Sequence, residues 1–189
     1  MDTDKHGYSK VPEPLFIATE RFDPTDGETW QKYFDWAKIP SLKEIVSLDG
    51  SLCPQLIKDF MDEDWNHIVK ADFQLNYFCD LDYLLNRVSD KSRRNILGLY
   101  RNADNHISEA PAARDFSFIG YDLIDEDTQI SALTNCGGFP DVFGNNELNS
   151  YGLISYFGRA SEVRRVLAAQ HPQDSHAQCE LYALWRLNE

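Results

Sequence analysis

The chain is poor in basic side chains and has no long apolar run, and each shortage argues against a class of protein. It has 18 lysine and arginine residues against 31 aspartate and glutamate residues, a formal net charge of −13, and no lysine after Lys91. Nucleic-acid affinity depends on clustered basic side chains that neutralise phosphates, so we expect no nucleic-acid partner. No apolar run approaches the roughly 18 residues of a membrane-spanning helix, so we expect no membrane partner.

The N-terminal residues and the cysteines favour a cytoplasmic protein. Residues 1–7 are polar, and no apolar stretch with a small-residue cleavage site follows, so they do not resemble a secretory signal. The cysteines Cys53, Cys79, Cys136 and Cys179 contain no CxxC pair. A chain with 13% aromatic residues can stabilise a core without disulfides, so we expect free and mostly buried thiols.

The composition favours a single globular domain over residues 1–189. The chain is 42% apolar, which is enough to bury one sizeable core, and it contains no repeat or low-complexity linker. Prolines at positions 12, 14 and 24 predict an extended lead-in over residues 1–25.

Helical spacing dominates the N-terminal part. Apolar residues at i, i+3, i+4 and i+7 predict an amphipathic helix over 26–39. Shorter helices are expected over 41–46, where Ser41 and Glu44 could form a capping box, and over 51–61. Two further helices are expected, over 80–88 with an aspartate cap and over 160–170.

Alternation of apolar and polar residues predicts strands in the rest of the chain. These segments are 72–78, 95–101, 116–124, 129–135 and 178–187. Three of them follow one another, which suggests an antiparallel meander, and the last is apolar enough to lie inside the sheet. We therefore predict an α+β fold with a mostly antiparallel sheet of about five strands, and with a helical N-terminal part.

The longest stretch without a predicted element, residues 136–155, is typical of a functional loop. Asn135 ends the preceding predicted strand, and Gly137 and Gly138 lie at the start of the loop, where glycines let the backbone approach a ligand closely. Asn135, Gly137 and Gly138 are therefore candidates for binding. Trp36 lies off the apolar stripe of its helix, so it is expected to be partly exposed and could anchor a partner.

A cysteine-dependent site is the most specific catalytic candidate in the sequence. A cysteine nucleophile needs a base and a group that orients the base, and Cys136, His176 and Asp174 could form such a set, with Asn135 as another orienting group. No family-specific nucleophile signature surrounds Cys136. The alternative interpretation is a buried cysteine before a glycine turn.

Cofactor and metal motifs are absent from the sequence. His171, His176 and Cys179 have zinc-binding side chains, but their spacing matches no standard site. The acidic runs 59–64 and 122–127 lack the pattern of a calcium loop, and residues 125–127 are most simply a solvated hairpin turn. Gly137-Gly138 lies in no phosphate-binding motif. We therefore predict no metal and no cofactor.

Three tracts, 76–85, 130–139 and 176–186, resemble segments of small uncharacterised bacterial proteins. This resemblance implies a bacterial protein and no particular catalytic residue. The size and acidity of the chain are also similar to those of immunity proteins, which neutralise a cognate bacterial toxin.

From these observations the chain is expected to be a protein-binding module for a cationic partner, with an immunity-type function as one form. The alternatives are a cysteine-dependent hydrolase or transferase that uses Cys136 and His176, and a structural homo-oligomer held by exposed aromatic residues.

Overall fold

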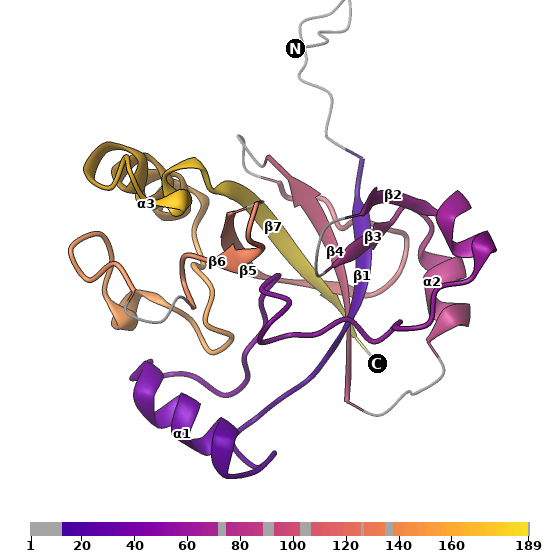
Figure 1. Cartoon of the computed structure of the whole chain (residues 1–189), viewed down its shortest axis with the longest axis horizontal. Coiled ribbons are helices and arrows are strands. Elements are labelled where there is room, and N and C mark those ends of the chain that lie inside the picture. Colours follow the sequence, from indigo (N-terminus) through magenta and orange to yellow (C-terminus); the bar gives the residue numbers. More distant parts are fainter. Residues whose placement is uncertain are drawn as a thin grey trace, which may run out of the picture.

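The computed structural model describes residues 13–71, 75–88, 93–102, 107–125, 127–134 and 138–188. In these ranges seven strands form one antiparallel sheet in the order β2-β3-β1-β4-β7-β5-β6. The strands are β1 (Leu15–Glu20), β2 (Ile68–Ala71), β3 (Asn76–Phe78), β4 (Arg94–Arg101), β5 (Phe116–Asp125), β6 (Ile130–Ser131) and β7 (Glu180–Leu187). The helices are α1 (Glu28–Ala37), α2 (Leu81–Arg87) and α3 (Phe157–Gln170), with short 3₁₀ turns η1 (Asp62–Asn66), η2 (Asn145–Glu147) and η3 (Ser175–Gln178). Figure 1 shows α1 and α3 at one end of the molecule and α2 at the other.

The predicted α+β class is therefore confirmed, but the sheet is larger than the five strands expected. Residues 15–20, expected within an extended lead-in, form β1 in the interior of the sheet between β3 and β4. Their extended backbone agrees with the prediction. Their position does not, because it depends on pairing such as that of Ile17 with Leu97, which no local pattern reveals.

β7 lies inside the sheet between β4 and β5, which confirms that the last strand is an interior one. It pairs with β4 on one side, where Leu184 faces Leu99, and with β5 on the other, where Leu181 faces Leu123. β4 and β5 are thus separated by β7, and the meander predicted through them is wrong.

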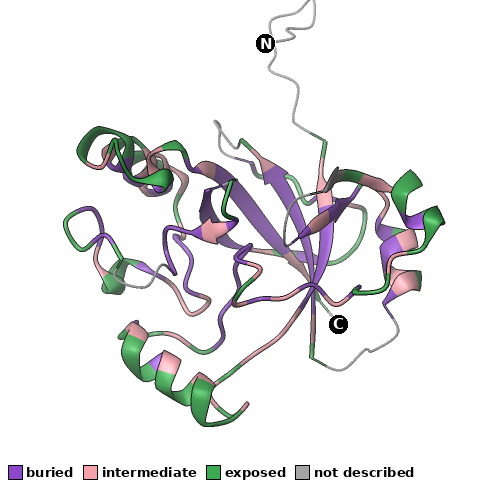
Figure 2. Ribbon diagram, viewed as in Figure 1, coloured by how far each residue is buried: buried purple, intermediate pink, exposed green. Residues whose placement is uncertain are grey.

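Both faces of the central strands are buried (Figure 2). On one face Phe16 and Leu181 join a core that includes the apolar sides of α2 and α3. On the other face Leu184 packs with Val46 and Leu48, which come from the irregular segment 41–61. Neighbouring positions in the central strands therefore alternate between two separate cores rather than between core and solvent.

The N-terminal part is less helical than predicted. α1 confirms the helix expected over 26–39, but residues 41–61 form turns in place of two short helices. Ser41 donates a hydrogen bond to the Leu148 carbonyl (3.2 Å) instead of capping a helix, and Glu44 is drawn into a network of ion pairs. Contacts with distant segments thus outweigh the local helical spacing.

The other two helices agree with their predictions. Asp80 caps α2, because its side chain accepts a hydrogen bond from the Tyr83 backbone N–H (2.9 Å). α3 ends at Gln170, where the helix predicted over 160–170 also ends. No helix within the described ranges is long and apolar enough to cross a lipid bilayer.

Candidate binding site

A cavity of about 280 Å³ lies between the C-terminal end of α1 and a facing segment made of residues 133–134 and 138–145. Four aromatic residues contribute to its wall, Tyr33 and Trp36 from α1, and Phe139 and Phe143 from the facing segment. The other lining residues are Ala37, Lys38, Ile39, Leu133, Thr134, Gly138, Pro140 and Asn145. We call this hollow the aromatic cavity.

The geometry of α1 exposes Trp36 at the aromatic cavity. Phe34 points inward and packs with Ile45 and Cys53, whereas Trp36, two residues further along the helix, points away from that core. Trp36 is 49% exposed, and its ring centroid lies 5.7 Å from that of Tyr33. The prediction that Trp36 is partly exposed is therefore confirmed.

Hydrogen bonds hold both walls of the aromatic cavity in place. The Asn145 side chain donates to the Ala37 carbonyl (2.8 Å), which joins the facing segment to the end of α1. Thr134 Oγ1 donates to the buried carboxylate of Asp49 (3.3 Å). A cavity whose walls are already joined loses little conformational entropy when a ligand enters.

Phe139 also contacts a histidine that is hydrogen-bonded to an aspartate. The rings of Phe139 and His176 are inclined by 66°, with their centroids 5.4 Å apart. His176 Nδ1 donates to Asp174 Oδ1 (2.8 Å), which also accepts from the His176 backbone N–H (2.9 Å). These two hydrogen bonds lower the pKa of Asp174 below its ordinary value.

The other ring nitrogen of His176 is left without a partner. Nε2 is buried, and no hydrogen bond reaches it in the described part of the chain. An aspartate that fixes the Nδ1–H tautomer leaves Nε2 as the basic nitrogen, as in catalytic triads. The structure therefore brings Asp174 and His176 together, while Cys136, the third residue of the predicted set, lies outside the described residues.

Asp174 also lines a second hollow, of about 300 Å³, which we call the acidic hollow. Its other lining residues are Asp125, Asp127, Ser175, Gln178 and Glu180. Burial would raise the pKa of Asp125, but hydrogen bonds from Thr128 and Ser175 outweigh that effect and lower it. Asp125 and Asp174 are therefore ionised at neutral pH, and the hollow attracts cationic groups.

The turn that contains Asp125 differs from the prediction in one respect. Residues 125–130 do connect two paired strands, as expected of a hairpin turn. Asp125, however, is buried rather than solvated. In place of water, its carboxylate accepts hydrogen bonds from the Asp127 backbone (3.1 Å) and from Thr128 (2.6 Å).

The predicted binding residues are only partly placed by the structure. Trp36 and Gly138, which are far apart in the sequence, line the same cavity. Asn135 and Gly137 lie outside the described residues, so their part in binding stays a prediction.

The possible zinc ligands do not converge. His171 Nε2 lies 2.8 Å from Asp141 Oδ2, whereas His176 turns to Asp174. Cys179 is buried, and burial raises the pKa of its thiol, which disfavours the thiolate that a metal requires. Within the described ranges no three histidine, cysteine, aspartate or glutamate side chains are arranged to hold a metal ion.

Sequence reasoning missed the rings that face Trp36. Phe139 follows the glycine pair directly, inside the loop that was singled out, so its position could have been noticed. Tyr33 lies on the apolar stripe of its helix, which favours a buried position. Which of these rings line a cavity depends on how residues 138–145 fold against α1, and nothing in either segment reveals that.

Asp122, the first residue of the acidic run 122–127, belongs to a buried hydrogen-bonding cluster that the sequence did not predict. Asp122 is fully buried, and burial raises the pKa of its carboxyl group. Its oxygens accept hydrogen bonds from Ser47 Oγ (2.7 Å), Ser131 Oγ (2.5 Å), the Leu48 N–H (2.9 Å) and the Leu123 N–H (2.9 Å). Ser47 also accepts from the backbone of Asp49, the residue that anchors Thr134.

Comparisons with models of protein families, with curated proteins and with solved structures found no match. The function of this chain must therefore be inferred from the geometry and charge of its own residues.

Proposed function

We propose that this chain is a protein-binding module that holds a cationic partner protein at the aromatic cavity. The observation that carries this proposal is Trp36, a large ring that is half exposed on the wall of a preformed cavity. Exposed tryptophans beside pockets are typical anchors of protein interfaces. Phe139 on the facing wall would enclose an apolar side chain of the partner against Trp36.

The size of the aromatic cavity favours a protein over a small molecule. Its volume of about 280 Å³ is slightly below the range of roughly 300–1,000 Å³ that is usual for small-molecule sites. Such a space suits one or two side chains that project from a larger surface. Binding would then bury the exposed half of Trp36, which favours association through the hydrophobic effect.

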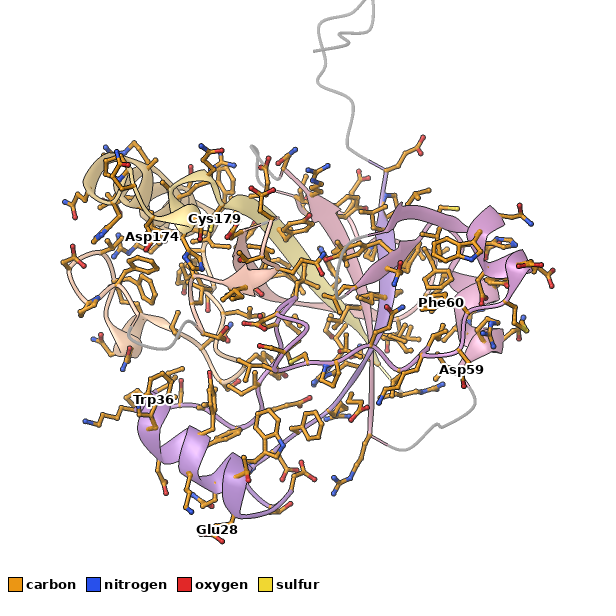
Figure 3. All side chains as sticks on the ribbon, in the orientation of Figure 1. Glu28, Trp36, Asp59, Phe60, Asp174 and Cys179 are labelled. Atoms are coloured by element: carbon orange, nitrogen blue, oxygen red, sulfur yellow. The ribbon has the colours of Figure 1, made fainter. Side chains whose placement is uncertain are left out.

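The charge of the chain favours a basic partner. The net charge is −13, and the acidic hollow is joined to the aromatic cavity through Asp174, His176 and Phe139. Figure 3 shows Trp36 and Asp174 at the same end of the molecule. A partner with lysine or arginine near an apolar anchor would match both hollows, and the negative field would speed the encounter. A basic bacterial toxin, neutralised by this chain as an immunity protein, is one such partner.

The test is capture of binding proteins from the source organism with tagged wild-type chain and with Trp36→Ala. We expect the wild type to retain a basic protein whose recovery falls as salt is raised, and Trp36→Ala to lose it. Tyr156→Ala is the matched control, because Tyr156 is an exposed aromatic residue (77%) outside the cavity. Equal recovery with Trp36→Ala and with the wild type would refute the proposal.

The immunity function has a separate test. If the captured protein arrests growth when it is produced alone, co-production of the wild-type chain should restore growth, and co-production of Trp36→Ala should not. A captured protein that is harmless would leave the binding proposal intact and remove the immunity interpretation.

A cysteine-dependent hydrolase or transferase is the second candidate, favoured by the bond between His176 and Asp174 and by the unpartnered Nε2 of His176. In such an enzyme His176 would take the proton of Cys136, whose thiolate would attack the substrate. The test is the pH dependence of alkylation of Cys136 by iodoacetamide. A pKa well below the ordinary ~8.5, shifted upward in His176→Gln, is expected of the enzyme. An ordinary pKa that is unchanged in His176→Gln would remove this candidate.

A further inference from the structure

A second surface exposes large apolar side chains at the other end of the molecule. The described residues contain five exposed large apolar side chains, and three of them, Met61 (48%), Trp65 (54%) and Val69 (55%), fall between residues 61 and 69. We call these three residues the Trp65 patch. Figure 3 shows Asp59 and Phe60, which adjoin the patch in the chain, at the end of the molecule opposite Trp36. Exposed apolar groups gathered in this way are typical of an interaction surface.

The turn that carries the Trp65 patch is firmly anchored. Asp64, in the middle of η1, is fully buried and accepts from Arg87 Nε (2.6 Å) and Nη2 (3.0 Å) and from the Tyr83 hydroxyl (2.8 Å). Asp64 Oδ2, which accepts from Arg87 Nη2, also accepts from the Met61 backbone N–H (2.7 Å), whereas Arg87 Nε and Tyr83 donate to Oδ1. Trp65 is therefore presented on a fixed turn, and a partner would not have to order it.

Unpaired negative charge adjoins the patch in the sequence. Asp59, Asp62 and Glu63 are exposed, and no ion pair reaches them within the described residues. The neighbouring Lys58 is already paired with Glu20 (2.9 Å). A second copy of this acidic chain, or an anionic lipid surface, would be repelled here, whereas a cationic segment would be attracted.

The adjoining sheet edge is poorly suited to strand addition. β2 is the first strand in the sheet order and pairs only with β3 in the described part of the chain. Its register shifts between Ile68 and Lys70, which leaves Val69 at an irregularity in the edge. Bulges and short edge strands hinder pairing with another chain, so docking would use the side chains of the patch.

We propose that the Trp65 patch binds a basic amphipathic segment of a partner protein. The apolar side of that segment would cover Trp65 and Val69, and its lysine or arginine side chains would lie beside Asp62 and Glu63. This proposal is independent of the aromatic cavity, which lies at the other end of the molecule.

The test uses two fluorescent synthetic peptides with the same leucine face, one with lysine and the other with glutamate on the polar face. Fluorescence anisotropy should show binding of the lysine peptide only, about tenfold or more weaker in Trp65→Ala. The double variant Asp62→Asn, Glu63→Gln should also weaken binding, chiefly at low salt. Tyr156→Ala is the matched control, because Tyr156 is an exposed aromatic residue outside both the Trp65 patch and the aromatic cavity, and it should bind like the wild type.

Three outcomes would overturn the proposal. Trp65→Ala could bind the lysine peptide as tightly as the wild type, or Tyr156→Ala could weaken binding as much as Trp65→Ala does, which would show non-specific attraction to an acidic protein. Concentration-dependent dimerisation in sedimentation experiments, abolished in Trp65→Ala, would instead assign the patch to a second copy of this chain. A result from Trp65→Ala counts only if its circular dichroism and unfolding match the wild type, and the charge variant provides the second test if they do not.

Discussion

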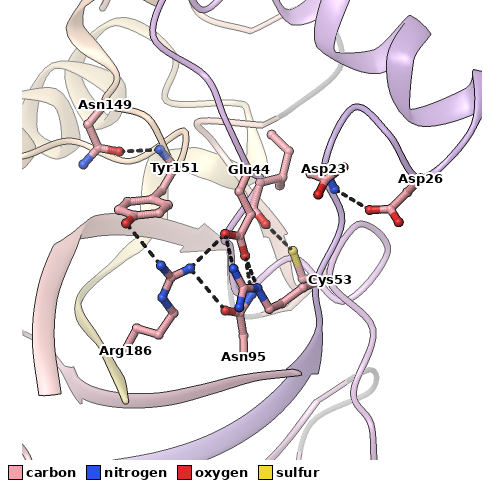
Figure 4. A network of polar contacts seen from close by, with 10 residues as sticks. Asp23, Asp26, Glu44, Cys53, Asn95, Asn149, Tyr151 and Arg186 are labelled. Atoms are coloured by element: carbon pink, nitrogen blue, oxygen red, sulfur yellow. Dashed lines mark hydrogen bonds and ion pairs between the residues drawn. The ribbon is translucent and has the colours of Figure 1, made fainter. Parts of the chain in front are cut away.

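Glu44 Oε2 accepts a hydrogen bond from Arg186 Nη1 at 2.9 Å, although the two residues are 142 positions apart. Glu44 also accepts from Arg21 (2.9 and 3.1 Å) and from Asn95 (3.1 Å), and Arg186 donates to the Tyr151 hydroxyl (3.2 Å), as Figure 4 shows in part. One carboxylate thus joins the irregular segment 41–61 to strands β4 and β7. Charge-assisted bonds of this kind stabilise a segment that has no regular hydrogen bonding of its own.

Arg87→Gln should destabilise the fold by about 3 kcal/mol, because it leaves the buried carboxylate of Asp64 without its counter-charge. Urea unfolding at pH 7 measures the change. Arg114→Gln is the matched control, since it removes an exposed pair with Asp82 and should have little effect. A loss in Arg87→Gln no larger than in this control would show that the buried pair is unimportant.

The pair of Arg87 with Asp64 also makes the stability of the fold depend on pH in the acidic range. The hydrogen bond from Arg87 lowers the pKa of Asp64 to about 2, against an ordinary value of about 3.9. A carboxyl group with a lowered pKa stabilises the fold above its unfolded pKa, and this contribution disappears as the pH falls through the folded value. The wild type should therefore lose about 2 kcal/mol from this group between about pH 4 and pH 2. Arg87→Gln should show a shallower decline over that interval.

The ionisation of Asp122 should lower the stability of the fold as the pH rises, whereas that of Asp64 raises it. Burial raises the pKa of its carboxyl group, so the group contributes stability below its unfolded pKa and loses it as the pH rises through the folded pKa. The stability of the wild type relative to Asp122→Asn should therefore fall from about pH 4 upward. Denaturant unfolding of both proteins between pH 4 and 7 tests this, because titrations common to the two cancel. Parallel pH curves would refute it.

Gly120→Ala should destabilise the protein by more than about 1 kcal/mol. Gly120 has a φ of 142°, and an added Cβ would lie 2.7 Å from the Cβ of Leu153. Gly158→Ala is the matched control in α3, where an added Cβ meets nothing within 4 Å. That control should raise stability by up to about 1 kcal/mol, because alanine favours the helix. Thermal unfolding of both variants checks the contrast, and similar midpoints would contradict it.

Alkylation of the native protein should distinguish the described cysteines. Cys79 is exposed, whereas Cys53 and Cys179 are buried, and burial raises the pKa of both buried thiols. In a Cys136→Ser background, iodoacetamide followed by mass spectrometry should label Cys79 alone until denaturant is added. Labelling of Cys53 or Cys179 at the same rate as Cys79 would mean that the core opens readily.

Sequence patterns predicted the elements whose own residues follow a regular apolar spacing. The stripe of α1 and the alternation in β7 each follow from local spacing, so both were found. Residues 41–61 have apolar residues at helical spacing but cover a face of the sheet as turns, and their contacts with Asp122 and Arg186 come from distant segments. No local pattern could have revealed those contacts.

The candidate site was predictable to a similar extent. Trp36 was identified because it lies off its helical stripe, which is a local property. The pairing of Asp174 with His176 was also accessible, because the two residues are close in the sequence and are joined by a cap of η3. The position of Phe139 opposite Trp36 could not be predicted, since it depends on the path of a loop more than a hundred residues away along the chain.

The position of β7 between β4 and β5 has a consequence for how this chain acquires its structure. Strand pairing divides the sheet into β2-β3-β1-β4 and β5-β6, and only β7 bridges the two halves. Until residues 180–187 have been synthesised, β4 and β5 each present an open edge that can recruit another polypeptide. These two edges are covered only when β7 pairs with both of them, so completion of the sheet waits for that strand.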